Sequence, residues 1–240
     1  MSVLFTYNGH VLVTSNGTAL SYTSPVPPID PYNPYNLPDG TIRYKFDDAS
    51  YDPSTDISSL VVGGLWTQVS SSPNVWDWSI TMDNPSLVGR FSNAFGGLAG
   101  TFHIMGANLQ GIGYQNDLYL TWSGCHLLAT VSMMDTRNVM DFMWAFAGSS
   151  IQHVAALPLS GRCNQMFSHC TSLLDIPQFE NRGVNNCQNM FDECVNVESG
   201  ILGCYNSLLP VISHYQCFMN CGINTLTGAA ELAQIPADWK

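Results

Sequence analysis

Charged side chains are scarce in this sequence. Asp, Glu, Lys and Arg make up 10% of its 240 residues, against about 25% in an average globular domain. Only two lysines are present, Lys45 and Lys240, and the formal net charge is −11. Binding to nucleic acid or to an anionic membrane surface needs clustered basic side chains. The composition therefore argues against both partners, whereas a surface of aromatic, Asn, Ser and Gly residues suits sugar or protein contacts.

A long apolar run is also missing. The residues Met1 to Tyr7 carry no basic side chain and lead directly into Asn8-Gly9. The sequence contains no apolar stretch long enough to cross a membrane, and the N-terminus does not resemble a secretory leader. The sequence thus predicts a protein that is made in the cytoplasm of the producing cell without a signal peptide. We expect it either to act there or to leave inside a particle released by lysis.

Catalytic and phosphate-binding motifs are absent as well. The sequence contains no G-x-S-x-G, no H-E-x-x-H, no P-loop and no Rossmann glycine pattern. His169 stands next to Cys170, but neighbouring residues of a helix point about 100° apart, which disfavours a Cys–His nucleophile pair. Paired carboxylates of a glycoside hydrolase remain an alternative, because such partners are often far apart in sequence. We predict no catalytic residue, no metal and no cofactor.

What the sequence does contain is an internal repeat. Cys163–Cys170 and Cys187–Cys194 both read C-x-x-M-F-x-x-C. Aromatic residues in a similar setting recur at nearly regular intervals from residue 95 to residue 218. This series consists of Phe95, Trp122, Phe146, Phe167, Phe191 and Phe218. A period of this length is typical of stacked units that are each too small to bury an apolar face alone.

The spacing within each unit predicts a short helix. Apolar or sulfur-bearing residues recur four before, one before and three after the aromatic residue, as at Cys163, Met166 and Cys170 around Phe167. These offsets match one face of a helix. A short apolar extended piece follows, such as the segment 173–177. A helix plus a strand in a unit of about 20–29 residues is typical of a leucine-rich repeat.

The repeated residues also resemble a known family. Ala94-Phe95, Ala145-Phe146 and the two M-F-x-x-C runs look like the units of BspA-like leucine-rich-repeat proteins, over roughly residues 86–228. Proteins with such repeats occur in bacteriophage particles and on bacterial surfaces. The resemblance implies an α/β leucine-rich-repeat solenoid, with the aromatic series and Cys163, Cys170, Cys187 and Cys194 as its repeat core.

The eight cysteines fit a reduced core better than disulfides or zinc. Cys163 and Cys170 would lie about 10 Å apart on one helix, beyond the ~7 Å between Cα atoms that a disulfide allows. No C-x-x-C pair is present, and Cys217 and Cys221 have no partner pair at zinc-ligand spacing. A buried free cysteine behaves as a small hydrophobic residue.

Residues 1–38 predict a β-hairpin anchor followed by a proline-rich arm. Apolar runs flank Asn8-Gly9, a strong hairpin turn signal, and a second Asn16-Gly17 follows. Six prolines then fall within residues 25–38, which favours either a stiff spacer or an ordered surface loop. The residues predicted to dock on a partner are Val3, Leu4, Phe5, Tyr7, Val11, Leu12 and Val13.

Residues 39–85 predict a β-rich cap for the repeats, and residues 86–240 the repeats with a closing C-terminal helix. Trp66, Trp76 and Trp78 fall in the cap, where they either cover an open apolar end or form a candidate carbohydrate-binding surface. Four acidic residues within 47–56 lack the spacing of a calcium loop, so a solvated turn is favoured over a cation site. These are Asp47, Asp48, Asp52 and Asp56.

Taken together, these features lead us to expect a non-enzymatic structural protein of a bacteriophage particle, such as a head or tail fibre or decoration protein. Its N-terminus would dock to other particle proteins and its repeats would face a host protein or glycan, with self-association of copies. A bacterial surface adhesin is the first alternative, and a glycan-degrading enzyme of the particle is the second.

Overall fold

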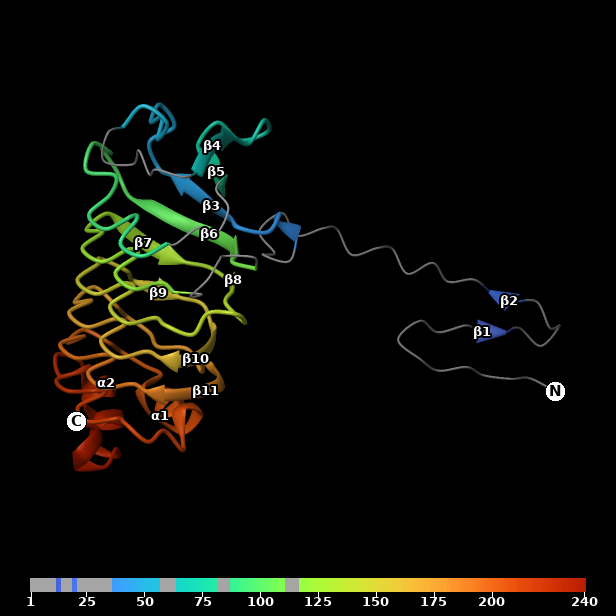
Figure 1. Cartoon of the computed structure of the whole chain (residues 1–240). Helices are drawn as coiled ribbons and strands as arrows, with labels where there is room; N and C mark the ends of the chain where they lie inside the picture. Colours follow the sequence, from blue (N-terminus) through green and yellow to red (C-terminus); the bar gives the residue numbers. More distant parts are fainter. Residues whose placement is uncertain (1–11, 14–18, 21–35, 57–63, 82–86, 111–116) are drawn as a thin grey trace.

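The structure is a computed structural model that describes residues 12–13, 19–20, 36–56, 64–81, 87–110 and 117–240 (Figure 1). The strands are β1 (Leu12–Val13), β2 (Ala19–Leu20), β3 (Thr41–Phe46), β4 (Gly64–Gln68), β5 (Val75–Ile80), β6 (Phe102–Asn108), β7 (Leu128–Val131), β8 (Met134–Asp135), β9 (His153–Val154), β10 (Pro158–Arg162) and β11 (Glu180–Asn186). The helices are α1 (Ile201–Leu208), α2 (Leu226–Ala233) and the 3-10 turn η3 (Ala237–Trp239).

Seven of the strands form one mixed sheet, in the order β4-β5-β3-β6-β7-β9, with β8 also paired to β6. The pairs from β4 to β6 are antiparallel, whereas β6 pairs with β7 and β8, and β7 with β9, in parallel. A separate parallel pair joins β10 to β11. In Figure 1 the chain descends from the antiparallel strands to α1 and α2 at the other end.

The alternating pattern of β3 shows how the antiparallel strands meet the core. Ile42, Tyr44 and Phe46 are fully buried, while Arg43 and Lys45 point to the other face, as a side-chain period of two requires. The indole Nε1 of Trp122 donates to the Tyr44 hydroxyl at 3.0 Å. This buried bond joins the antiparallel strands to the repeated part of the chain.

The predicted α/β leucine-rich-repeat solenoid is wrong. The described residues form a mixed seven-stranded sheet with only two α-helices. Neither helix falls on the helical segments predicted around the repeated aromatic residues, whereas α2 lies where the closing C-terminal helix was predicted. Cys163–Cys170 and Cys187–Cys194 are runs of tight turns instead. The physical reason lies in the backbone: Gln165 and His169 have φ angles of 56° and 61°, and a right-handed helix requires negative φ at every residue.

Runs of this kind, here called turn segments, recur along the chain, and successive turn segments stack on one another. They comprise residues 87–94, 118–125, 142–149, 163–170, 187–194 and 214–221. Within residues 163–170, every second amide closes a turn, as Met166 N does to Cys163 O at 3.2 Å. The other amides reach the next segment, as Phe167 N does to Met190 O at 2.9 Å. Alternation of this kind satisfies the buried backbone without a helix.

One aromatic ring per turn segment forms a column through the core. Successive rings from Trp122 to Phe218 lie 5.1 to 5.4 Å apart and are tilted by only 5° to 8°. At the end of the column, Trp239 of η3 covers Phe218 at 6.3 Å. The members Trp122, Phe146, Phe167, Phe191 and Phe218 are all completely buried.

The first turn segment has a different register from the one predicted. Phe91 donates from its amide to Thr121 O at 2.9 Å, as Trp122 does to Ala145 O, and the Phe91 ring lies 6.1 Å from Trp122 at 4°. Phe91 therefore occupies the aromatic column in place of Phe95. Phe95 is also fully buried, but it packs on Phe102 at 4.5 Å.

Of the N-terminal docking residues, only two are described. Leu12 and Val13 form β1, which pairs antiparallel with β2 at Leu20 and Ala19. The predicted hairpin around Asn8-Gly9 lies outside the described residues, as do Val3, Leu4, Phe5, Tyr7 and Val11. The proline-rich arm also lies outside them up to residue 35.

Candidate functional site

The three tryptophans singled out as a candidate ligand surface lie mainly in the core. Trp78 is fully buried with its ring edge-on to Phe91 at 5.2 Å, and Trp76 is 9% exposed. Trp66 is half-buried against Tyr44 at 5.4 Å. Because Trp76 and Trp78 expose almost no ring surface, this trio does not offer a carbohydrate platform and instead fills the interior beside the antiparallel strands.

The acidic residues at 47–56 are engaged in local bonds. Asp48 accepts from the Ser50 amide at 2.9 Å, and Asp52 accepts from the Ser54 amide at 2.8 Å. Hydrogen bonding from Thr101 lowers the pKa of Asp47, whereas Asp56 accepts from the Tyr51 hydroxyl. Over the part of the chain that the structure describes, no three His, Cys, Asp or Glu side chains gather to hold a metal ion.

All eight cysteines are buried free thiols, in agreement with the prediction. In three turn segments the thiol three residues after the aromatic position donates to the preceding segment, as Cys194 Sγ does to Phe167 O at 3.1 Å. Burial raises the pKa of Cys170 to about 11 and that of Cys125 to about 12. Such thiols are poor nucleophiles, and His169 is exposed while Cys170 faces the core.

Two carboxylates do lie together at the start of the turn segments. Asp117 and Asp141 pair in a parallel bridge, and each accepts from an amide two residues later, at 2.7 Å and 2.9 Å. Burial raises the pKa of Asp117, and the nearby Asp141 charge adds to this effect. Arg162 forms an ion pair with Asp141. Both carboxylates thus hold the turns that follow them.

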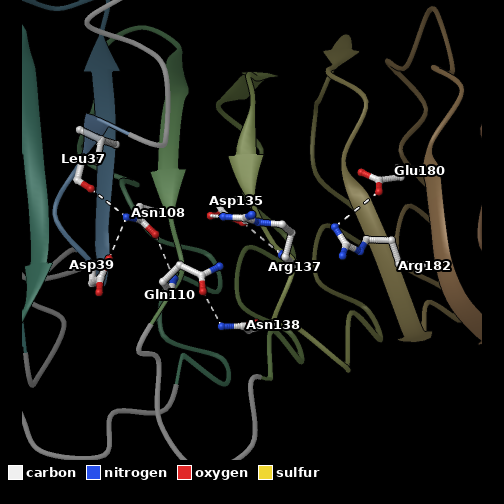
Figure 2. Close-up of polar contacts among 9 residues, drawn as sticks. All are labelled: Leu37, Asp39, Asn108, Gln110, Asp135, Arg137, Asn138, Glu180 and Arg182. Carbon is white, nitrogen blue, oxygen red and sulfur yellow. Dashed lines mark hydrogen bonds and ion pairs between the residues drawn. The ribbon is translucent and has the colours of Figure 1, made fainter.

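A row of polar side chains lies along the ends of β6 and β8 (Figure 2). Asn108 donates to Leu37 O at 2.8 Å and to the Asp39 carboxylate at 3.0 Å. Arg137 forms a two-pronged bond to the buried Asp135, at 2.8 Å and 2.7 Å. The Asn108 bonds join the end of β6 to residues 37–39, far away in the sequence, and so brace the sheet, whereas the bonds of Arg137 to Asp135 are local.

A shallow cleft of about 400 Å³ lies on the turn segments. We call it the Trp144 cleft. It is lined by Ser123, Gly124, His126, Trp144, Ala147, Gly148, Gln165, Ser168 and His169. The lining residues come from three successive turn segments and from the residue just after the first of them.

The cleft exists because two neighbouring segments have glycine two residues after the aromatic position. Later segments have His169, Glu193 and Asn220 there, all with the same positive φ of 54° to 61°. At Gly148 a Cβ atom would meet nothing within 4 Å, so the space above this residue is open. At Gly124 a side chain of the preceding segment fills part of the same space. Gly148 therefore forms the open floor of a gap in a surface that is otherwise covered by side chains.

Trp144 forms one wall of this gap. Its side chain is partly exposed, at 38%, and its indole Nε1 donates to Gln165 Oε1 at 2.6 Å. The φ of Trp144 is 60°, a conformation that is costly for a bulky residue. The equivalent position holds Leu120, Gln165, Asn189 and Gln216 in other segments, so the fold requires the positive φ but no aromatic residue.

Two histidines stand at the rim of the cleft. His126 and His169 are both exposed, and His169 Nδ1 shares a hydrogen bond of 2.8 Å with the Ser168 hydroxyl. Among the described residues that line the cleft, none is Asp, Glu, Lys or Arg. The site therefore combines one aromatic surface with neutral hydroxyl, amide and imidazole groups.

The sequence prediction missed this site. It treated His126 as a structural surface residue, weighed His169 only as a partner of Cys170, and looked for a ligand at Trp66, Trp76 and Trp78. The signal was present outside the aromatic series: within one unit, Trp144 and Gly148 stand two residues before and two residues after Phe146. Recognising it required the knowledge that these two positions face solvent, which a helical unit would not imply.

Comparison with known proteins gives no assignment. No family model matches the sequence, no curated protein matches it, and no solved structure matches the fold. Within the described ranges, a helix with the length and apolar character needed to span a bilayer is not found.

Proposed function

We propose that this protein is a non-enzymatic structural component of a bacteriophage particle that displays its turn segments for contact with a host surface. The observation that carries this proposal is the repeated surface itself. Amides of each turn segment bond to one another and to the next segment, which leaves the side chains beside the aromatic column free to vary from segment to segment. A rigid backbone with variable exposed side chains is suited to binding.

The proposal that the protein displays a binding surface and is not an enzyme is supported by the surroundings of its thiols and paired carboxylates. The thiols are buried, with the pKa of Cys170 raised to about 11 by burial, and the paired Asp117 and Asp141 hold their own turns. The particle assignment is supported by the C-x-x-M-F-x-x-C units at Cys163 and Cys187, which resemble repeats of phage and bacterial surface proteins.

The test is quantitative mass spectrometry of density-purified phage particles and, separately, of the envelope fraction of the producing cells. We expect peptides of this protein in the particles at a fixed ratio to the major capsid protein. Absence from particles together with enrichment in the envelope would contradict the proposal and favour the surface adhesin.

Deletion of residues 1–24 sharpens this test. These residues include the predicted docking positions and β1–β2, whereas the aromatic column begins only at Phe91. We expect the shortened protein to fold and to be lost from particles. Unchanged incorporation would show that docking lies elsewhere in the chain.

A further inference from the structure

We propose that the Trp144 cleft binds a neutral carbohydrate, with Trp144 against the apolar face of a sugar ring. This inference deepens the proposed function. It rests on that function in one respect only, namely that the turn segments face a partner. The cleft is built by departures from the repeat that the fold does not need: a tryptophan where other segments have Leu, Gln or Asn, and glycines where later ones have larger residues.

The chemistry of the lining selects the ligand class. A sugar ring offers C–H groups on its face and hydroxyl groups at its edge. In the cleft, the partly exposed Trp144 ring supplies apolar surface, while Ser168, His169 and Gln165 place hydroxyl, imidazole and amide groups beside it. Aromatic side chains with a few convergent polar groups are the usual composition of small-ligand sites.

The charge of the lining and the size of the cleft narrow the class of ligand further. The lining residues that the structure describes include no Asp, Glu, Lys or Arg, so they offer neither a carboxylate for a cationic ligand nor a fixed positive charge for an anionic one. The volume of about 400 Å³ lies in the range of small-molecule sites, roughly 300–1,000 Å³. A stable protein partner instead needs on the order of 800 Å² of contact area on each side. A short neutral oligosaccharide fits these limits.

Two variants remove the cleft without disturbing the turn. Trp144→Gln introduces the residue found at the same position in two other segments, Gln165 and Gln216, whose φ values are both 56°. Gly148→Asn fills the floor with the residue found at the equivalent position of the last segment, Asn220, at φ 54°. Tyr215→Gln, which removes a 60% exposed aromatic side chain from a different place, is the matched control.

The experiment offers the full-length protein neutral oligosaccharides of glucose, galactose, mannose and N-acetylglucosamine, two to four rings long, with sialyllactose as an acidic counterpart. Binding is measured by saturation-transfer difference NMR and titration. We expect at least one neutral sugar to bind. Trp144→Gln and Gly148→Asn should each weaken that binding by about tenfold or more, and Tyr215→Gln should leave it unchanged.

Three results would overturn the inference: no neutral sugar binds, sialyllactose alone binds, or both cleft variants keep the affinity of the unaltered protein. Thermal unfolding of each variant checks that the fold is intact. If one of the two cleft variants fails to fold, the other still tests the site. Particle incorporation is measured without any sugar, so a failed sugar test leaves the proposed particle role standing, and failed incorporation leaves the sugar site standing.

Discussion

The turn segments and the antiparallel strands bury aromatic rings in two different ways. From Trp122 to Phe218 each segment contributes one ring, and neighbouring rings are almost parallel, at 5° to 8°. Around β3 the rings instead form a cluster without a repeat, in which Tyr44 meets Phe91, Phe95 and Trp66 at 53° to 55°. The first arrangement is set by the spacing of bonded backbones, and the second by the shapes of particular side chains.

This difference teaches where substitutions should be tolerated. In the turn segments, a residue taken from the same position of a neighbour enters a nearly identical environment. In the cluster around Tyr44, Tyr44 and Trp66 have no such equivalent, because they come from strands that do not repeat, whereas Phe91 belongs both to the cluster and to the aromatic column. The following predictions test this contrast, in order of decreasing expected effect.

The largest effect should come from Phe167→Ala. Phe167 is fully buried between Phe146 and Phe191, each at 5.4 Å. Removing a buried aromatic ring of this kind costs about 3–5 kcal/mol of unfolding free energy, because transfer and cavity terms add. Urea denaturation measures the loss. A change below about 1 kcal/mol would mean that the aromatic column does not support the fold.

Gly161→Ala should cost about 3 kcal/mol, because its Cβ atom would collide with the backbone. Gly161 has a φ of 62°, and a Cβ atom there would lie 2.0 Å from the backbone oxygen of Met140. That oxygen accepts a hydrogen bond from the Arg162 amide at 3.0 Å, so moving it would break this bond. Gly148→Ala is the matched control: its φ is 67° but nothing lies within 4 Å. This control should cost only about 1 kcal/mol, the strain of a positive φ. Equal losses of stability in urea denaturation would contradict the close approach of Met140.

Tyr44→Phe should cost about 2 kcal/mol, because it leaves the buried Trp122 N–H without its acceptor. Trp122→Phe removes that donor and inserts the ring used at Phe146, so the double variant isolates the bond between the strands and the turn segments. We expect Tyr44→Phe to cost less when Trp122→Phe is already present. Strictly additive losses would show that this bond contributes nothing to stability.

At neutral pH the buried thiols give the smallest effect, because their contribution to the pH dependence of stability appears only at alkaline pH. Burial raises the pKa of Cys170 to about 11, whereas the pKa of an unfolded thiol is about 8.5. The unfolded chain therefore loses this proton first, so stability is complete below about pH 8.5 and falls as the pH rises to about 11. The slope is ~1.4 kcal/mol per pH unit for each such thiol. Cys170→Ser, which copies Ser149 of the preceding segment, should reduce that slope over the same pH range. If Cys170→Ser leaves the slope of unfolding free energy against pH unchanged over this range, the raised pKa of the Cys170 thiol is contradicted.

The sequence by itself determined which residues repeat and which are buried. The aromatic residues from Trp122 to Phe218 and all eight cysteines are in the core, because a repeated apolar spacing can only be satisfied by repeated burial. The sequence also indicated the strands around Trp76 and Trp78, and it left open whether these side chains cover an apolar end or face a ligand.

Only the tertiary structure decided the path of the chain between those buried residues. The spacing around Phe167 indicates which side chains point inward. A helix and a run of turns are both compatible with that spacing. The sign of φ at Gln165 and His169 is set by amides that reach the following turn segment, such as His169 N to Asp192 O at 2.7 Å. The register of Phe91 and the gap beside Trp144 follow from contacts of the same kind. Because these bonds form between segments, no single segment contains the information that fixes its own backbone.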